Sequence, residues 1–167
     1  LTALLHRDNT ISTIIKLRAI ARHQQLLRID FETPPSHEVL HAALADFHAQ
    51  LPLADVVILS DYGKGGLAHI AEMIRLARAA GKPVLVDPKG DDYARYRDAT
   101  LLTPNRSEFR EVAGSWKTDA EFNGKAEKLR TELQLDALLV TRSGDGMSLY
   151  RANEALHEPT QTREVFD

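Results

Sequence analysis

The sequence predicts an α/β fold in which a mostly parallel sheet is covered by helices on both faces and is preceded by an antiparallel β-hairpin. Between residues 56 and 140, short apolar runs alternate with amphipathic helical segments, which is typical of strand–helix–strand units in a parallel sheet. Near the N-terminus, two β-branched runs are separated by only two residues, and this spacing indicates a hairpin. A turn at residues 143–146, followed by an apolar run at 147–151, adds an antiparallel edge strand.

The N-terminal part is expected to form the hairpin and one helix. The two hairpin strands are predicted at residues 12–21 and 24–31, joined by Arg22 and His23. Ser36 follows two prolines and can cap a helix, because a serine side chain accepts a hydrogen bond from the first turn. The apolar positions of this helix recur at helical spacing and are Val39, Leu40, Ala43, Leu44 and Phe47.

The remaining elements alternate between strands and helices. Gly81 is placed to end the first helix of this part, since glycine adopts the left-handed conformation that closes many helices. The predicted strands are residues 56–59, 83–86, 100–103 and 137–140, and the predicted helices are residues 67–80, 107–113 and 118–133.

Composition excludes several classes of function. The 167 residues carry 21 Lys and Arg against 24 Asp and Glu, a net charge of −3, without a long basic run, so no nucleic-acid partner is expected. No apolar stretch approaches the ~18 residues of a membrane span, and no signal-peptide pattern is present, so we expect a cytoplasmic protein without a membrane partner. The absence of cysteine excludes disulfides, thiolate metal sites and a cysteine nucleophile.

Polar, loop-forming residues follow each of the four apolar strands. Ligands of open α/β sheets bind outside the carboxyl ends of the strands, so we expect all four loops to face one site. The loops are Ser-Asp-Tyr-Gly-Lys-Gly-Gly at residues 60–66, Asp-Pro-Lys-Gly at 87–90, Thr-Pro-Asn-Arg-Ser-Glu at 103–108 and Thr-Arg-Ser-Gly at 141–144.

The residue types in these loops suit a phosphate ligand and a magnesium ion. Glycine-rich stretches at 63–66 and 144–146 expose backbone N–H groups, and cationic side chains surround them. Asp61, Asp87 and Glu108 can hold a divalent metal through water. Each loop alone also reads as an ordinary turn, and Asn105-x-x-Glu108 also reads as a helix capping box. The cations are Lys64, Lys89, Arg106 and Arg142.

The segment His37-Glu38-Val39-Leu40-His41 matches the H-E-x-x-H pattern of zinc hydrolases. The extended pattern requires Gly and His where this chain has Leu44 and Phe47. We therefore interpret these histidines as a solvated face in the first turns of a helix.

Four segments resemble the ribokinase-like (pfkB) carbohydrate kinases, and within that family they are most similar to kinases of D-glycero-β-D-manno-heptose 7-phosphate. The N-terminal stretch at residues 16–30 is similar to the lid and sugar-binding strands of those kinases. The four segments are L-S-D-Y-G-K-G at residues 59–65, V-L-V-D-P-K-G at 84–90, L-L-T-P-N-R-S-E at 101–108 and L-L-V-T-R-S-G-D-G-M-S-L at 138–149.

The resemblance implies transfer of the γ-phosphate of ATP to the C1 hydroxyl of the heptose 7-phosphate, with Mg²⁺, on the route to ADP-heptose for the lipopolysaccharide inner core. It implies water-mediated metal contacts for Glu108 and Asp87. The sugar-phosphate candidates are Lys16, Arg18, Arg28, Asp61 and Lys64. The nucleotide-binding residues that it implies are Asn105, Arg106, Ser107, Glu108, Thr141, Arg142, Ser143, Gly146, Asp87 and Lys89.

The family's general base is an aspartate in a G-A-G-D segment, which the 167 residues do not contain. We therefore expect residues 1–167 to be an interior, inactive portion of one kinase domain, with a hairpin lid at about 12–31 and an α/β core at about 36–167. The base is expected beyond Asp167, and Asp61 is not expected to replace it. A homodimer through the hairpin and a fused adenylyltransferase domain are possible partners, and another sugar kinase or a non-catalytic nucleotide-binding module are the alternative functions.

Overall fold

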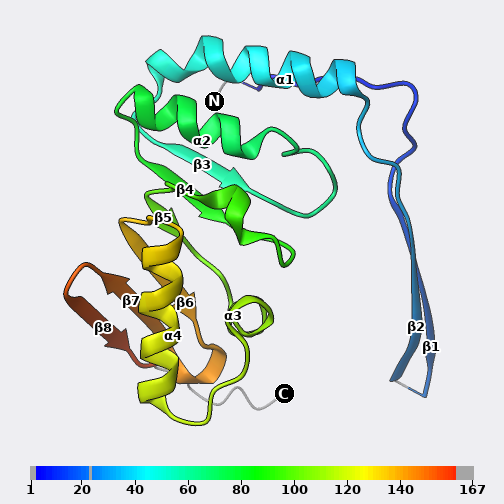
Figure 1. The fold of residues 1–167 in the computed structure, drawn as a ribbon. Helices are drawn as coiled ribbons and strands as arrows, with labels where there is room; N and C mark the ends of the chain where they lie inside the picture. The colour runs from blue at the N-terminus through cyan, green and yellow to red at the C-terminus, as the bar shows by residue number, and fades with distance from the viewer. Residues whose placement is uncertain (1–2, 23, 161–167) are drawn as a thin grey trace.

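The central sheet has six strands in the order β3-β4-β5-β6-β7-β8 (Figure 1). The computed structural model describes residues 3–22 and 24–160. Strands β3 to β6 run parallel and β7 and β8 antiparallel, so the predicted parallel sheet with an antiparallel edge is confirmed. The strands are β3 (Val57–Ser60), β4 (Val84–Asp87), β5 (Leu101–Leu102), β6 (Ala137–Thr141), β7 (Met147–Arg151) and β8 (Glu154–Glu158), and the last of these was not predicted.

The helices begin at side chains that can cap them. Ser36 accepts a hydrogen bond from the Val39 amide, and Thr118 accepts one from the Glu121 amide. The second helix begins three residues later than predicted, because the Ile70 amide bonds to the Leu67 carbonyl in a preceding turn. The helices are α1 (His37–Gln50), α2 (Ile70–Ala79), α3 (Arg106–Ala113) and α4 (Asp119–Glu132).

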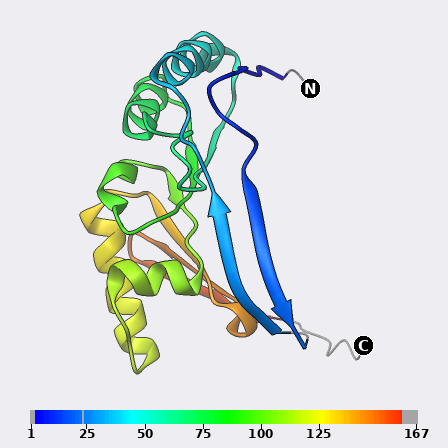
Figure 2. The same ribbon diagram turned by 90° about the vertical axis from the view of Figure 1, so that its right-hand side faces the viewer.

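The helices lie on one face of the sheet, which corrects the expectation that they cover both faces (Figure 2). Alternate side chains of a strand point to opposite faces, so each strand sends one set toward the helices and one set away. On the second face, Ile58 is 69% exposed and Leu85, Leu139 and Leu149 are partly exposed within the described residues. Because these positions are apolar, the strands read as continuous apolar runs, which led to the prediction of helices on both faces. The set buried under the helices comprises Val57, Leu59, Val84, Val86, Leu102, Leu138 and Val140.

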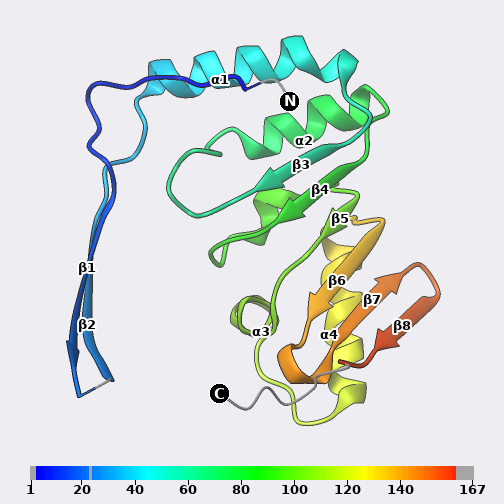
Figure 3. The same cartoon turned by 180° about the vertical axis from the view of Figure 1, so that it is seen from behind.

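The predicted hairpin is present as β1 (Ile15–Ala21) and β2 (Gln24–Phe31). It stands apart from the six-stranded sheet (Figures 1 and 3) and lies on the opposite side of that sheet from the helices (Figure 2). Lys64, in the loop after β3, forms an ion pair with Glu32 at the base of the hairpin. The hairpin therefore projects from the core as an arm.

Within residues 3–22 and 24–160, no helix combines the length and the apolar character needed to cross a membrane.

Candidate functional site

The polar loops that follow the parallel strands lie along one edge of the sheet. The Asp61 amide donates to the Asp87 carbonyl at 2.9 Å, which holds the loop after β3 beside the end of β4. On the other side, the Thr141 amide donates to the Pro104 carbonyl at 3.1 Å, and Asn105 and Thr141 form a parallel bridge. Parallel pairing therefore brings together loops that lie far apart in the sequence.

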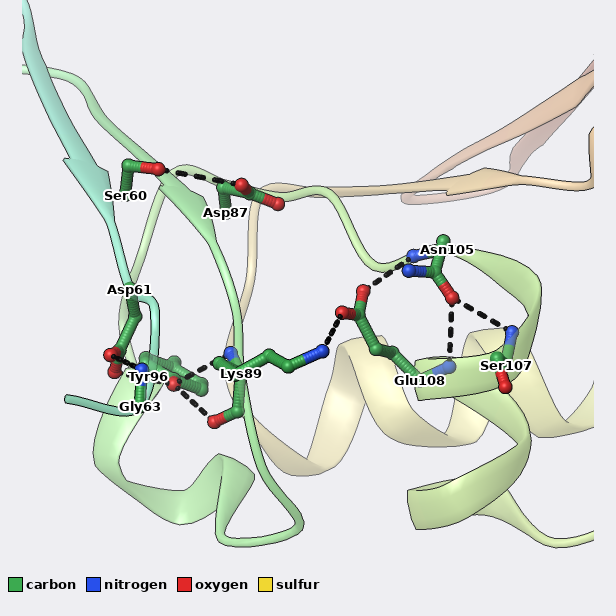
Figure 4. Close-up of polar contacts among 9 residues, drawn as sticks. All are labelled: Ser60, Asp61, Gly63, Asp87, Lys89, Tyr96, Asn105, Ser107 and Glu108. Carbon is green, nitrogen blue, oxygen red and sulfur yellow. Dashed lines mark hydrogen bonds and ion pairs between the residues drawn. The ribbon is translucent and has the colours of Figure 1, made fainter. Parts of the chain in front are cut away.

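Asn105 and Glu108 form a capping box at the start of α3 (Figure 4). The Asn105 side-chain oxygen accepts hydrogen bonds from the amides of Ser107 at 2.9 Å and Glu108 at 3.0 Å. Glu108 Oε2 in turn accepts from the Asn105 amide at 3.0 Å. The capping-box interpretation of this motif is thus correct as a description of the helix end. It fixes the first turn of α3 at the sheet edge.

Lys89 connects the loop after β4 to this capping box. Its Nζ lies 2.9 Å from Glu108 Oε1, and the Lys89 side chain is 53% exposed while that of Glu108 is 11% exposed. The hydrogen bond from Lys89 to the Glu108 carboxylate, together with their Coulomb attraction, raises the pKa of Lys89. An exposed ammonium thus stands at the edge of the sheet, beside the amino end of α3.

A hollow of about 410 Å³ opens at the amino end of α3. The helix dipole makes such a helix end favourable for anions, although the Asn105 side chain already accepts from the amides of Ser107 and Glu108. Two arginine side chains also line the hollow. Arg110 was not singled out from the sequence, although it follows Arg106 by four residues and so lies on the same side of the helix. The lining residues are Asn105, Arg106, Ser107, Arg110 and Ser143.

Arg106 and Arg142, both nucleotide candidates, make ion pairs within the protein. Arg106 Nη1 lies 2.5 Å from Asp145 Oδ2, which ties α3 to the loop after β6. Arg142 Nη2 lies 2.6 Å from Asp119 Oδ1, and its guanidinium stands 4.5 Å from the centre of the Phe122 ring. The structure therefore directs the Arg142 side chain toward α4, away from the hollow at α3.

The loop that contains Ser143 and Gly146 begins with the short 3-10 helix η3 (Ser143–Asp145). Gly146 has a φ of +87°, and a Cβ at this position would meet the Glu158 carbonyl oxygen at 2.0 Å. Glycine is required here because β8 ends against its backbone. The loop presents Ser143 to the hollow at α3 from the opposite side.

Asp61 and Lys64, two of the sugar-phosphate candidates, are held in different ways. Asp61 is 6% exposed, and its Oδ1 accepts from the Gly63 amide at 2.8 Å. Its Oδ2 lies 2.9 Å from the hydroxyl of Tyr96, a residue that ends the 3-10 helix η2 (Tyr93–Tyr96). The structure thus gives Asp61 a position inside the fold. Lys64 remains near the base of the hairpin through Glu32.

The three basic candidates of the hairpin share one face of it. The strand register pairs Lys16 with Asp30 and Arg18 with Arg28, so all four side chains lie on the same side. Arg28 Nε lies 3.2 Å from Asp30 Oδ1. Two arginines directly opposite each other repel, and an anionic ligand between them would relieve this repulsion.

The residues predicted to contact a metal fit an indirect role. Both oxygens of Glu108 already accept hydrogen bonds, and Asp87 Oδ2 accepts a long one of 3.4 Å from the Ser60 hydroxyl. Among the described residues, no three His, Asp or Glu side chains converge as a metal-binding group. A Mg²⁺ ion at this edge would therefore take its ligands mainly from phosphate and water, as Mg²⁺ commonly does. Asp87 and Glu108 would contact its water shell.

The H-E-x-x-H histidines lie elsewhere, on α1. The Nε2 atoms of His37 and His41 are 3.3 Å apart, and both residues are exposed. The ring of His69, just before α2, is centred 5.2 Å from that of His41. These histidines mark the contact between α1 and α2.

Comparison with known proteins gives matches along most of the chain. The pfkB family carbohydrate kinase model matches residues 2–167. The Bifunctional protein HldE of Proteus mirabilis is 54% identical over 159 residues, which cover 95% of this chain and 34% of that protein. HldE of Chromohalobacter salexigens is 53% identical over 163 residues, which cover 97% of this chain and 34% of that protein. The chain spans about a third of the length of these curated relatives.

Solved structures share the fold at low sequence identity. The ribokinase of Giardia lamblia aligns with a TM-score of 0.70 at 17% identity, over 93% of this chain and 51% of that chain. The Arabidopsis thaliana ribokinase complexed with ribose and ATP aligns with a TM-score of 0.62 at 17% identity, over 86% and 47% of the two chains. The expected ribokinase-like fold class is therefore confirmed. Because the family match runs through nearly the whole sequence, the chain belongs to the pfkB family of carbohydrate kinases.

Proposed function

We propose that the protein containing this chain transfers the γ-phosphate of ATP to the C1 hydroxyl of D-glycero-β-D-manno-heptose 7-phosphate. The observation that carries this proposal is the placement of Lys89, Asn105 and Thr141 along one edge of the sheet. The likeness of residues 16–30 to the sugar-binding strands of heptose-phosphate kinases supports this substrate within the family. The 54% identical relative, HldE, supports the same assignment.

The nucleotide phosphates would lie along the edge between Lys89 and the amino end of α3. Phosphoryl transfer needs mainly positive charge and positioning, since the protein forms no covalent bond to the transferred group. The cations at this edge are Lys89 and Arg106, which are paired with Glu108 and Asp145, and Arg110. Ser107 and Ser143 add hydrogen-bonding groups. Mg²⁺, when bound, would neutralise part of the charge on the phosphate oxygens. Asp87 and Glu108 would orient its water ligands.

The phosphate of the sugar substrate would meet the basic face of the hairpin. Lys16, Arg18 and Arg28 lie on one side of the two strands, and Lys64 stands near the hairpin base. Arginine recognises a phosphate through paired N–H donors, whereas lysine adds a compact point charge. This arrangement would separate sugar recognition on the hairpin from nucleotide recognition at the sheet edge.

We further propose a second copy of the chain as a partner of the hairpin. The face opposite the basic one is apolar, and its side chains are 38–59% exposed. Exposed apolar faces of this kind mark protein interfaces. The side chains of this apolar face are Ile15, Leu17, Leu27, Ile29 and Phe31. An adenylyltransferase domain fused to the kinase is a further proposal, which the greater length of the HldE relatives supports.

The test uses the gene product that contains this chain. We expect MgATP-dependent phosphorylation of the heptose 7-phosphate in preference to fructose 6-phosphate and ribose, and a large loss of MgATP affinity in Lys89→Met. A preference for another sugar would show that the protein is a kinase with a different substrate from the one proposed. MgATP binding without transfer to any sugar would favour the non-catalytic nucleotide-binding module. Absence of MgATP binding would contradict the proposal.

A further inference from the structure

The Tyr96 hydroxyl lies beside the backbone of Lys89, between its nitrogen and its carbonyl oxygen (Figure 4). Tyr96 is fully buried, and its hydroxyl oxygen accepts a hydrogen bond from the Lys89 amide at 3.1 Å. The same hydroxyl lies 2.9 Å from Asp61 Oδ2 and 2.9 Å from the Lys89 carbonyl, either of which can accept its single proton. One phenol thus joins the loops that follow β3 and β4.

Asp61 extends this connection to the other side of Lys89. Its Oδ1 accepts a hydrogen bond from the Gly63 amide at 2.8 Å, and this bond fixes the turn after β3. Gly63 has a φ of +68°, and a Cβ at this position would stand 3.3 Å from Lys89 Cγ. The backbone of Gly63 therefore lies against the aliphatic stem of Lys89, and a larger residue would push that stem away.

We propose that Tyr96 is a positioning residue for Lys89. Its hydroxyl holds the Lys89 backbone directly and holds Gly63 against the Lys89 stem through Asp61. A free lysine side chain has many rotamers, and fixing its base reduces the entropy lost when the ammonium binds an anion. The inference rests on the proposed function, in which the Lys89 ammonium binds the nucleotide phosphates. Tyr96 itself touches no phosphate in this arrangement.

Tyr93 provides a matched control from the same 3-10 helix. It is buried to a similar degree, at 4% exposed, and its ring packs edge-on against Tyr96 with centroids 5.5 Å apart. Its hydroxyl is buried and has no hydrogen-bond partner among residues 3–22 and 24–160. Tyr93→Phe therefore removes a buried hydroxyl from the same region that, unlike the Tyr96 hydroxyl, makes no hydrogen bond to Lys89.

The experiment is a double-mutant cycle in the gene product that contains this chain. Tyr96→Phe and Tyr93→Phe are prepared in the unaltered background and in Lys89→Met, and MgATP affinity is measured by calorimetry. We expect Tyr96→Phe to weaken MgATP binding about fivefold, the equivalent of one net hydrogen bond, and Tyr93→Phe to leave it unchanged. In the Lys89→Met background, Tyr96→Phe is expected to have no further effect, because its influence passes through Lys89.

Equal effects of the two phenylalanine variants, or a Tyr96→Phe effect that persists in Lys89→Met, would overturn the inference. Failure of the unaltered protein to bind MgATP would instead overturn the proposed function. If Tyr96→Phe does not fold, hydrogen exchange of the Lys89 amide in the unaltered protein decides the matter. Protection of that amide supports the inference, and exchange at the rate of a free amide contradicts it.

Discussion

At the scale of single residues, the proposed site consists of side chains that also hold the fold together. Asn105 caps α3 and Glu108 completes the capping box, while the same carboxylate holds the Lys89 ammonium. The spacing Asn-x-x-Glu was enough to predict the cap, because the geometry of a helix start is local. The direction of the Arg142 side chain could not be predicted. That direction depends on Asp119 and Phe122, which lie in α4, whereas Arg142 lies in the loop after β6.

The double role of Asn105 can be separated from simple capping by comparison with Thr118, which caps α4. Asn105→Ala and Thr118→Ala are each expected to lower the free energy of unfolding by about 1 kcal/mol, measured by urea denaturation. Only Asn105→Ala is expected to weaken MgATP binding, since α3 begins at the proposed phosphate site and α4 does not. Similar losses of MgATP affinity in both variants would show that Asn105 acts through stability alone.

Buried phenols make stability depend on alkaline pH. Burial, together with the neighbouring Asp61 carboxylate and against the opposing effect of the Lys89 backbone hydrogen bond, raises the pKa of Tyr96 to about 12. Burial also raises the pKa of Tyr93 and Tyr150. The tyrosines of the unfolded chain ionise near pH 10. The stability that the protonated, buried phenols contribute is therefore fully present below about pH 10 and is lost as the pH rises toward 12. We expect the free energy of unfolding to fall over this range, and to fall less steeply in Tyr93→Phe.

The check on this prediction uses tyrosinate absorbance in a Tyr62→Phe background. Of the 4 tyrosines in the 167 residues, Tyr62 is 74% exposed, so its removal from the 167-residue chain leaves the three buried phenols. Titration of these phenols near pH 10 while the protein is still folded would show that burial does not protect them.

At the scale of elements, the hairpin is the part whose existence the sequence predicted most directly and whose surroundings it described least. Alternating β-branched residues and a short turn define two strands locally. The register then divides the side chains into a basic face and an apolar face, and both are exposed. A two-stranded arm without a covered face is only marginally stable in water, which favours a partner on its apolar side.

Association through the hairpin is tested by charge substitution. Leu17→Lys places a charge in the apolar face, so it is expected to shift the protein from dimer to monomer in sedimentation experiments at micromolar concentration. Arg18→Ala changes the opposite face and serves as the control, with association expected to be unchanged. A protein that is monomeric without any substitution, or a dimer unaffected by Leu17→Lys, would contradict a hairpin interface.

At the scale of the whole molecule, the helices cover one face of the sheet and leave an apolar second face within the described residues. The proposed nucleotide site lies at the edge where the parallel strands β3 to β6 end. The basic hairpin projects on the side of the sheet away from the helices. The sheet edge and the hairpin belong to two separate sheets, and the proposed reaction needs the nucleotide at the first and the sugar phosphate at the second to come together. The 167 residues also contain no G-A-G-D segment. The family resemblance places the general base, an aspartate, in such a segment.

Catalysis is therefore expected to depend on a chain that continues through such a segment. General-base catalysis contributes roughly 10²–10⁴-fold, so the 167 residues alone are expected to transfer phosphate slower by at least this factor. The measurement is ADP release with heptose 7-phosphate, comparing the 167-residue chain with one that includes the segment. Comparable turnover by both would show that another group, within residues 1–167, acts as the base.

The sequence by itself predicted the hairpin, the four parallel strands, the strand β7, the helices between them and the loops proposed to carry the site, but not β8. Strands, caps and turns depend on neighbouring residues, and parallel pairing then places the carboxyl ends of β3 to β6 on one edge. Only the tertiary structure decided that Asp61 is buried against Tyr96, that Arg110 joins the hollow at α3, and that Arg142 points toward α4. These outcomes rest on contacts between residues distant in the sequence, whose side-chain directions no local pattern encodes.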